Sequence, residues 1–519
     1  MLACCGARVG NGAPATVAHG LNADVGAGMA SESTERPTVA IAGATGFVGT
    51  ALRRALAPTY RIIGLTRSPV RAQANTMSDG ETWRHCDLFD RRAVHEALRD
   101  ADYAVYLVHS MHPSSRLTQA SVADLDLLQA DNFARAAEAQ GVEQLLYVGG
   151  LVPSGNDLSP YLQSRREVAA TLASGAVPLT TLRAGLIVGR GGTWLRLLIN
   201  LVRRLPVMIL PAWARATIQP IALSDVVRAL QHCLGAPEAY DASYDLGGPD
   251  VMTYREMIER TAATLGLSRH ILQSPVDAPG LSKLWVRVFS GAPWALVSPL
   301  IDRMRHGARV SGNPLQRWLA PEAEPYEQAL RASIDASGAP YPNPREALRD
   351  ADDAVIRSTS VARSVQRLPL PAGYTARDIA AEYIRWLPTM GGPLLNCDVS
   401  DDRVVQFRVP PLRLTLLELT LETDRHPDER QLFHVTGGVL ADVSHAQTGR
   451  LEFRLALSGE CIIAAVHDFA PRLPWYVYNS TQAIAHLVVM AGFRKHLGRI
   501  AKRRALASAD DTPPQPAWS

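Results

Sequence analysis

One glycine-rich segment near the start of this chain constrains its fold more than any other stretch. Residues 38–42 are a continuous apolar, β-branched run, which is typical of a strand buried on both faces of a sheet. Gly43, Gly46 and Gly49 follow at intervals of three residues, and residues 47–56 have the pattern of a helix. This order of strand, glycine turn and helix predicts a dinucleotide site, because the turn lets a pyrophosphate approach the helix N-terminus.

The three glycines have different expected functions in that turn. Gly43 permits the tight turn, Gly46 lets the phosphates approach the backbone, and Gly49 lets the helix pack against the strand. The residues of the turn that we expect to contact a cofactor are Gly43, Thr45, Gly46, Phe47, Val48 and Gly49.

Predicted strands and helices alternate after the turn, which indicates an α/β fold with a Rossmann-like parallel sheet covered by helices on both faces. Ligands of such sheets bind outside the C-terminal ends of the strands. The expected strands are 61–66, 83–86, 103–108, 144–148 and 179–183, and the expected helices are 91–98, 124–140 and 159–174. The candidate cofactor-binding residues at the strand ends are Arg67, Asp87, Leu88, His109, Ser110 and Gly149.

Arg67 predicts which nicotinamide cofactor is preferred. It lies 67 − 43 = 24 residues after Gly43, about where an NAD site places the acid that binds the ribose 2′-hydroxyl. An arginine in that place suits a 2′-phosphate, so we expect NADP, with NADPH preferred over NADH, and possible help from Arg71. The alternative is that Arg67 is an ordinary solvated arginine.

Charge and cysteine usage exclude other classes of protein. The net charge of +3, from 53 basic and 50 acidic residues, argues against nucleic acid as a partner. The six cysteines include no CxxC pair, so we expect buried thiols in a reducing compartment, a cytoplasmic location and no metal site.

The predicted organisation has five parts. Residues 1–37 lack the apolar core of a signal peptide and are expected to be a disordered leader, with Met29 as an alternative start. No apolar run is long enough for a spanning helix. The other expected parts are a nucleotide-binding domain at 38–335, a linker at 336–357, an α+β domain at 358–506 and a disordered tail at 507–519.

Four segments together resemble the atypical or extended short-chain dehydrogenases/reductases. They are residues 43–49, 87–88, 219–226 and 244–249. Residues 106–111, 164–168 and 205–208 narrow the resemblance to bacterial NmrA-like proteins that carry a C-terminal domain of unknown function. The resemblance implies a Rossmann-like domain that binds NAD(P).

That family uses a Ser, Tyr and Lys set, and the resemblance implies which residues would replace it here. Tyr161 takes the tyrosine position and Arg165 stands where lysine is expected, so Arg165 can hold charge but cannot release a proton. Gly149 falls near the serine position, which leaves Ser110 or Ser154 as substitutes. The catalytic candidates are therefore Tyr161, Arg165 and Ser110, although Tyr161 is equally well explained as an ordinary residue of a helix N-terminus.

The C-terminal pattern resembles a helix-grip fold, in which an antiparallel sheet and a long helix hold an apolar ligand. Polar candidates for such a pocket are His467, Asp468 and His486, and a packed core without a cavity is the alternative. The expected strands are 404–409, 412–423, 431–439, 450–457 and 460–466, with helices at 376–386 and 478–504.

Two Trp-, Leu- and Arg-rich segments, 191–218 and 282–305, are open to three interpretations: a cover over an apolar substrate, a partner or membrane surface, or core-facing helices. The basic run 494–504 is either a solvated helix face or a contact for an anionic membrane. We therefore expect a small apolar substrate and a possible peripheral membrane contact, and the sequence does not predict an oligomeric state.

The expected function is an NADP(H)-dependent oxidoreductase acting by hydride transfer on an apolar carbonyl, enone or quinone. The alternative is a non-enzymatic nucleotide sensor or assembly factor, which the NmrA-like resemblance also allows. The missing serine favours the alternative, whereas a tyrosine with a neighbouring cation at Tyr161 and Arg165 favours chemistry.

Overall fold

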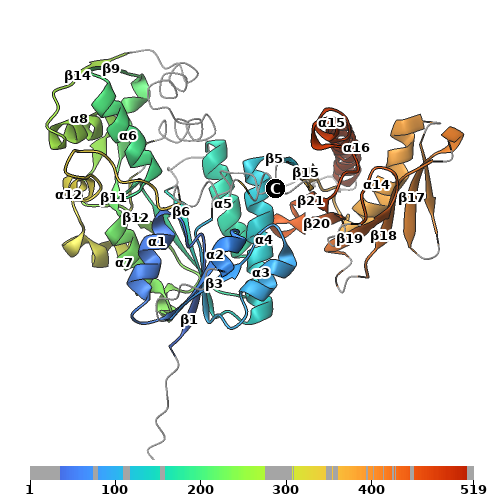
Figure 1. Cartoon of the computed structure of the whole chain (residues 1–519), viewed down its shortest axis with the longest axis horizontal. Helices are drawn as coiled ribbons and strands as arrows, with labels where there is room; N and C mark the ends of the chain where they lie inside the picture. Colours follow the sequence, from blue (N-terminus) through green and yellow to red (C-terminus); the bar gives the residue numbers. More distant parts are fainter. Residues whose placement is uncertain are drawn as a thin grey trace, which may run out of the picture. The chain divides into compact units, whose positions relative to one another are not determined.

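A seven-stranded parallel sheet forms the N-terminal domain, with strand order β12-β7-β6-β4-β1-β2-β3 (Figure 1). The computed structural model describes residues 36–510 apart from 74–79, 109–116, 152–157, 275–306, 308, 346–353, 355–360, 393–394, 401–402, 413, 424–425, 427 and 445–448. All five residues of β1 are buried, as the apolar run predicts. The strands are β1 Thr38–Ala42, β2 Arg61–Thr66, β3 Glu81–His85, β4 Tyr103–Tyr106, β6 Gln144–Gly150, β7 Leu179–Ala184 and β12 Ser243–Leu246.

Helices cover both faces of this sheet, which confirms the predicted α/β architecture. One face packs against α3 Arg91–Ala97, α4 Val122–Gln140 and α5 Pro160–Leu172. The other face packs against α1 Phe47–Leu56, α7 Leu223–Cys233 and α11 Pro314–Leu319. The Ser121 side chain caps the start of α4 by accepting a hydrogen bond from the Asp124 N–H. The helix ends at Gly141, whose φ of 72° lies in the left-handed region.

A second apolar cluster completes this domain around α6 Thr193–Arg204 and α8 Tyr254–Thr264. Leu195, Leu198, Ile199 and Val202 of α6 are buried, so this part of segment 191–218 faces the core, whereas segment 282–305 lies outside the described residues. The remaining elements are α2 Pro69–Gln73, β8 Ile187–Val188, β9 Val207–Leu210, η1 Ala212–Arg215, β10 Thr217–Ile218, β11 Ile221–Ala222, η2 Pro237–Ala239, β13 Met252–Thr253, β14 His270–Gln273, η3 Ala320–Glu322 and α12 Tyr326–Arg331.

The second sheet has eight strands in the order β16-β17-β18-β19-β20-β21-β15-β5, whereas five were predicted, because β5, β15 and β16 were not expected. A purely antiparallel sheet built from residues after 357 was expected. Strand β5 Leu117–Ala120 instead comes from the N-terminal half and pairs parallel with β15, so the sheet is mixed. The other strands are β15 Ala362–Pro369, β16 Asn396–Val399, β17 Val404–Val409, β18 Leu414–Leu421, β19 Arg430–Gly437, β20 Arg450–Ala456 and β21 Cys461–Phe469.

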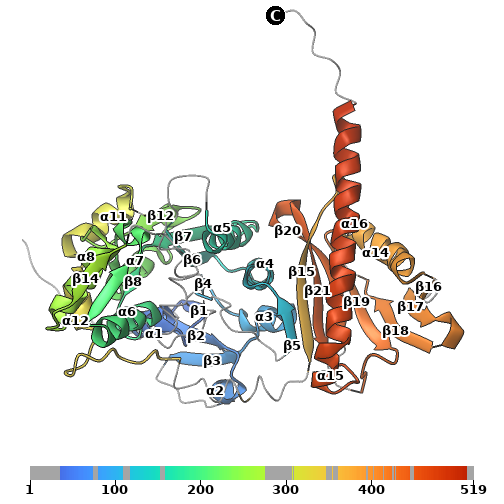
Figure 2. The same ribbon diagram turned by 90° about the horizontal axis from the view of Figure 1, so that it is seen from above.

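Helices pack against both faces of the second sheet (Figure 2). On one face α14 Ala376–Gly391 and α16 Gln482–Asp510 bury a cluster that includes Tyr383, Phe453 and Phe493. On the other face Leu125 and Leu128 of α4 pack against Val365, Ile463 and Ala465. The remaining short elements around this sheet are η5 Pro410–Leu412, η6 Leu457–Gly459 and α15 Trp475–Ser480.

The predicted linker is described for residues 336–345 and 354 only. Part of it lies against the N-terminal domain: the Arg190 guanidinium is 3.6 Å from the centroid of the Tyr341 ring, and Asn343 Nδ2 donates to Thr193 Oγ1 at 3.2 Å. The domain boundaries and the helix-grip assignment remain predictions. None of the helices that the structure describes combines the length and apolarity needed to cross a bilayer.

Candidate functional site

The glycine turn between β1 and α1 has the geometry that a dinucleotide requires. Gly43 has φ +87°, and its carbonyl accepts from the Gly46 N–H at 2.9 Å. A Cβ at Gly49 would lie 2.2 Å from the Gly43 carbonyl oxygen, so only glycine fits there. Among the residues that the structure describes, no side chain caps α1 at Gly46, and the first N–H groups of a helix are a favourable site for an anion.

The remaining residues of the turn hold it in place. Thr45 lies in the turn itself, and Phe47 begins α1 with its ring next to Gly192. Val48 packs against the core cluster beneath α1, and Arg53 Nε donates to the Ala44 carbonyl at 2.9 Å. The backbone conformation of this turn is therefore fixed by the fold itself.

Arg67 and Asp87 follow the neighbouring strands β2 and β3, and both are half-buried. Asp87 Oδ2 accepts from Arg363 Nη1 of β15 at 2.5 Å. Burial opposes ionisation of Asp87, but the charges of Arg363 and Arg67 outweigh it and hold the pKa of the carboxyl below its usual value. Arg71 lies with its guanidinium 4.7 Å from the centroid of the Trp83 ring.

Arg363 also anchors its own domain, a role that sequence analysis missed. Its Nε and Nη2 atoms donate to Asp468 Oδ1 at 2.9 and 2.7 Å, and its guanidinium lies 4.8 Å from the centroid of the Phe89 ring. Asp468 has φ +47°, an uncommon backbone conformation for aspartate inside a strand. Beside this cluster the Leu88 carbonyl accepts from Asn132 Nδ2 at 2.9 Å.

Tyr161 and Arg165 lie one turn apart on α5, as their spacing predicts. The Arg165 guanidinium is 5.6 Å from the centroid of the Tyr161 ring. Arg165 forms a buried ion pair with Asp126 of α4, and the two side chains are only 3% and 1% exposed. Sequence analysis missed Asp126, because a single acid on an amphipathic helix carries no motif.

Gly149 and Tyr147 lie together near the C-terminal end of β6. A Cβ at Gly149 would approach the Tyr147 ring at 3.1 Å. Burial raises the pKa of Tyr147 to about 12, so this phenol remains protonated at neutral pH. His109, Ser110 and Ser154 lie outside the described residues.

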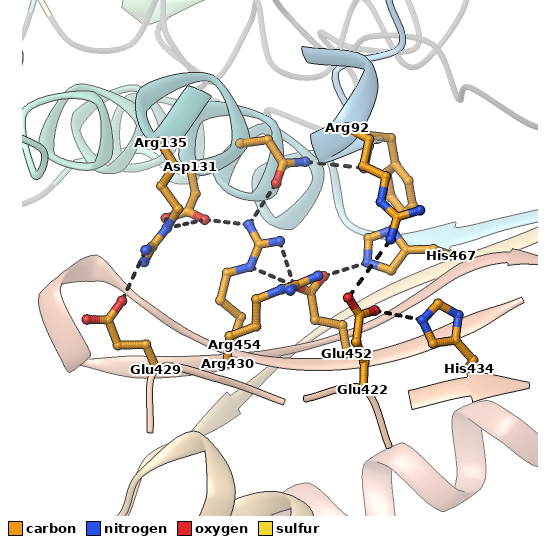
Figure 3. A network of polar contacts seen from close by, with 12 residues as sticks. Arg92, Asp131, Arg135, Glu422, Glu429, Arg430, His434, Glu452, Arg454 and His467 are labelled. Atoms are coloured by element: carbon orange, nitrogen blue, oxygen red, sulfur yellow. Dashed lines mark hydrogen bonds and ion pairs between the residues drawn. The ribbon is translucent and has the colours of Figure 1, made fainter. Parts of the chain in front are cut away.

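Buried charges join α4 to the second sheet (Figure 3). Arg454 Nη1 of β20 donates to Asp131 Oδ2 at 2.5 Å and to Asn132 Oδ1 at 2.7 Å. Its Nε and Nη2 donate to Glu452 Oε1 at 2.9 and 2.6 Å. His467, expected as a pocket residue, instead has its Nε2 2.6 Å from Glu452 Oε2.

Opposite charges balance this buried cluster. Burial alone would raise the pKa of Glu452, but Arg454 and the hydrogen bond from His467 hold it well below its usual value. Arg367 of β15 adds ion pairs to Asp124 at 3.0 Å and to Glu167 at 2.8 Å. The N-terminal domain and the second sheet are therefore joined by a buried charge cluster around Arg454 and by half-buried ion pairs of Arg367.

One protein family matches the segment that contains the glycine turn. Residues 39–190 match the model of the NAD dependent epimerase/dehydratase family. The match covers less than a third of this chain and includes the glycine turn at residues 43–49. Auxiliary protein GraX of Staphylococcus aureus (strain NCTC 8325 / PS 47) is 31% identical over 115 residues, which are 22% of this chain and 37% of that protein. The chain thus spans little more than a third of the length of that relative.

Three solved structures are similar to part of this chain. A nucleoside-diphosphate-sugar epimerase from Staphylococcus aureus is 16% identical with a TM-score of 0.46, covering 57% of this chain and 99% of its own. Triphenylmethane reductase from Citrobacter sp., complexed with NADP(H), is 18% identical with a TM-score of 0.47, covering 57% and 100%. An NADPH-dependent quinone oxidoreductase from Escherichia coli is 19% identical with a TM-score of 0.42, covering 60% and 99%.

Proposed function

We propose that this protein is an NADP(H)-dependent oxidoreductase that acts on an apolar carbonyl, enone or quinone. The observation that carries the proposal is the glycine turn, where Gly43 has a positive φ and Gly49 leaves no space for a Cβ. This turn and the uncapped N-terminus of α1 would hold the pyrophosphate. NADPH, when bound, supplies a hydride to the acceptor carbon.

The preference for NADP rests on the cations beside the ends of β2 and β3. Arg67 follows β2, where it can donate to a 2′-phosphate. Asp87 would repel that phosphate, but its charge is balanced by Arg363 at 2.5 Å. Because Arg363 shares in compensating Asp87, that carboxylate engages less of the charge of Arg67.

Tyr161 would act as the proton donor in this reaction. Its hydroxyl would protonate the acceptor oxygen as the acceptor carbon is reduced, and solvent would return the proton. A glycine at 149 supplies no hydroxyl to polarise the acceptor, and losing one such donor reduces a rate by about a hundredfold to a thousandfold. Enones and quinones need less polarisation than ordinary ketones, so we expect them to be the better acceptors.

The second candidate is a nucleotide sensor or assembly factor without turnover. The observation that favours it is the pairing of Arg165 with Asp126, because a side chain only 3% exposed is poorly placed to hold a cofactor ribose. In this alternative NADPH binds and no acceptor is reduced.

One experiment separates the candidates. NADPH binding is measured by fluorescence, and NADPH oxidation is followed with a panel of quinones, enones, ketones and aldehydes. Wild type, Tyr161→Phe and Gly49→Val are compared, the last as a variant that cannot form the turn. Turnover that Tyr161→Phe reduces supports the enzyme, and tight binding without turnover supports the sensor. Equal binding by wild type and Gly49→Val would reject the nucleotide site itself.

A further inference from the structure

Helices α15 and α16 present large apolar side chains to solvent. Trp475 and Tyr476 of α15 are 42% and 59% exposed. Ile484, Leu487 and Val488 of α16 are 53%, 41% and 53% exposed. The three α16 residues follow the i, i+3, i+4 spacing, so they form one stripe along the helix.

The opposite side of α16 packs in the core of its domain. Ala483, Met490, Phe493 and Leu497 are each at most 2% exposed and lie in the apolar clusters beneath the helix. Phe493 packs edge-on against Tyr383 with ring centroids 5.1 Å apart. The helix therefore cannot rotate to bury the stripe, which remains available to a partner.

Positive charge is concentrated in the same segment, although Arg494 and Arg504 donate to the carbonyls of Arg367 and Ala372. Residues 469–509 contain no Asp or Glu and seven basic residues, which are Arg472, Arg494, Lys495, Arg499, Lys502, Arg503 and Arg504. Lys495 lies seven positions after Val488, and Lys502 lies seven after Lys495. Seven residues are close to two helical turns, so both lysines extend the apolar stripe, and both are exposed.

We propose that this face of α15 and α16 binds the surface of an anionic lipid bilayer. Apolar residues flanked by Trp, Tyr and a cationic stretch are the composition of helices that lie in a bilayer interface. Clusters of four to eight Lys or Arg on such a helix attract anionic headgroups. The apolar stripe would lie at the acyl boundary, with Lys495 and Lys502 among the headgroups.

Charge complementarity favours lipid over a second copy of the chain. A twofold interface would bring this acid-free segment against itself, so its cations would meet no opposite charge within the segment. An anionic bilayer offers the opposite charge together with an apolar layer for Ile484 and Val488. The proposal does not depend on the activity of the nucleotide-binding domain.

The test uses the full chain and sedimentation with two kinds of vesicle, phosphatidylcholine alone and phosphatidylcholine mixed equally with phosphatidylglycerol. Wild type should bind the mixed vesicles and lose that binding at high salt. Ile484→Ser/Val488→Ser and Lys495→Glu/Lys502→Glu should each weaken the partition coefficient by more than about tenfold. Unchanged circular dichroism spectra and urea denaturation midpoints would show that these surface variants remain folded.

Two control variants test whether the loss of vesicle binding is specific to the α15 and α16 face. Val399→Ser replaces another exposed apolar residue, 62% exposed on β16. Arg317→Glu/Arg331→Glu changes the net charge by the same amount as the lysine variant, at two exposed sites on the N-terminal domain. Both should bind vesicles like wild type. Three results would each overturn the proposal. They are no binding to mixed vesicles, equal losses of binding in the controls, and a wild-type dimer that is dissociated by Ile484→Ser/Val488→Ser.

Discussion

Arg454 of β20 and Asp131 of α4 are 323 residues apart in the chain, and their side chains form a buried hydrogen-bonded ion pair of 2.5 Å. The arginine is 1% exposed and the aspartate 6%. A charge withdrawn from water to this degree is stable only while its partner is present. The pair therefore makes the stability of the second sheet depend on the N-terminal domain.

Replacing Arg454 should show this dependence. Arg454→Met leaves the carboxylates of Asp131 and Glu452 buried with less compensation, so we expect a loss of about 3–5 kcal/mol in the free energy of unfolding. Urea denaturation followed by circular dichroism measures it. Arg385→Met is the control, since Arg385 pairs with Glu382 but is 69% exposed, and it should cost less than about 1 kcal/mol. Similar losses in the two variants would contradict the prediction.

Arg363 should couple the second sheet to cofactor binding, if the proposed function holds. Arg363→Leu removes a positive charge that compensates the Asp87 carboxylate next to Arg67. This loss should weaken NADPH binding by about tenfold and NADH binding less. Fluorescence titration of both cofactors tests it. Arg367→Leu is the matched control, because Arg367 lies on the same face of β15 but pairs with Asp124 and Glu167. Equal weakening by both variants would show a general effect of sheet docking.

Arg67 should determine the preference between the two cofactors. A charge-assisted contact to the 2′-phosphate contributes about 1.5–3 kcal/mol, or roughly tenfold to a hundredfold in affinity. Arg67→Ala should therefore lose most of the preference for NADPH while binding NADH as before. Arg71→Ala measures any contribution of this second arginine to the preference for NADPH. If wild type binds both cofactors equally, the prediction is wrong.

His486 should make the protein less stable in mild acid. Its Nε2 lies 3.0 Å from Ser364 Oγ, and burial lowers the pKa of the imidazole to about 4 from 6.5. Between these values the unfolded chain binds a proton that the folded protein does not, so the free energy of unfolding falls as the pH falls. Lowering the pH from 6.5 to 4.5 should cost about 2 kcal/mol from this group.

Denaturant titrations across that pH range measure the effect. His486→Asn keeps a polar partner for Ser364 and should show a flatter dependence on pH. His85→Asn changes an exposed histidine and should retain the dependence of wild type. An unchanged pH dependence in His486→Asn would assign the acid sensitivity to other groups.

The first sheet could be predicted because each of its signals is local. The apolar run 38–42, the glycines that follow it and the alternation of strands with helices all lie within short segments. A local turn such as that at Gly43 is determined by residues a few positions apart, so the sequence contains the complete pattern.

The contacts of the second sheet could not be predicted in the same way. Arg450, Glu452 and Arg454 alternate with apolar residues, a pattern that normally indicates a solvent-exposed strand face. In the structure Arg454 and Glu452 are buried, because α4 supplies Asp131 and Asn132 to the same cluster. Neither segment alone contains a signal for the other.

Strand β5 has a consequence for how the protein is made. Leu117 pairs with Ala362, so this strand leaves the ribosome 362 − 117 = 245 residues before its neighbour in the sheet. Until synthesis reaches β15, an unpaired strand edge is available to other nascent chains. A product truncated before residue 362 would keep that edge permanently and should aggregate, so the C-terminal half of the chain protects the N-terminal half during its own synthesis.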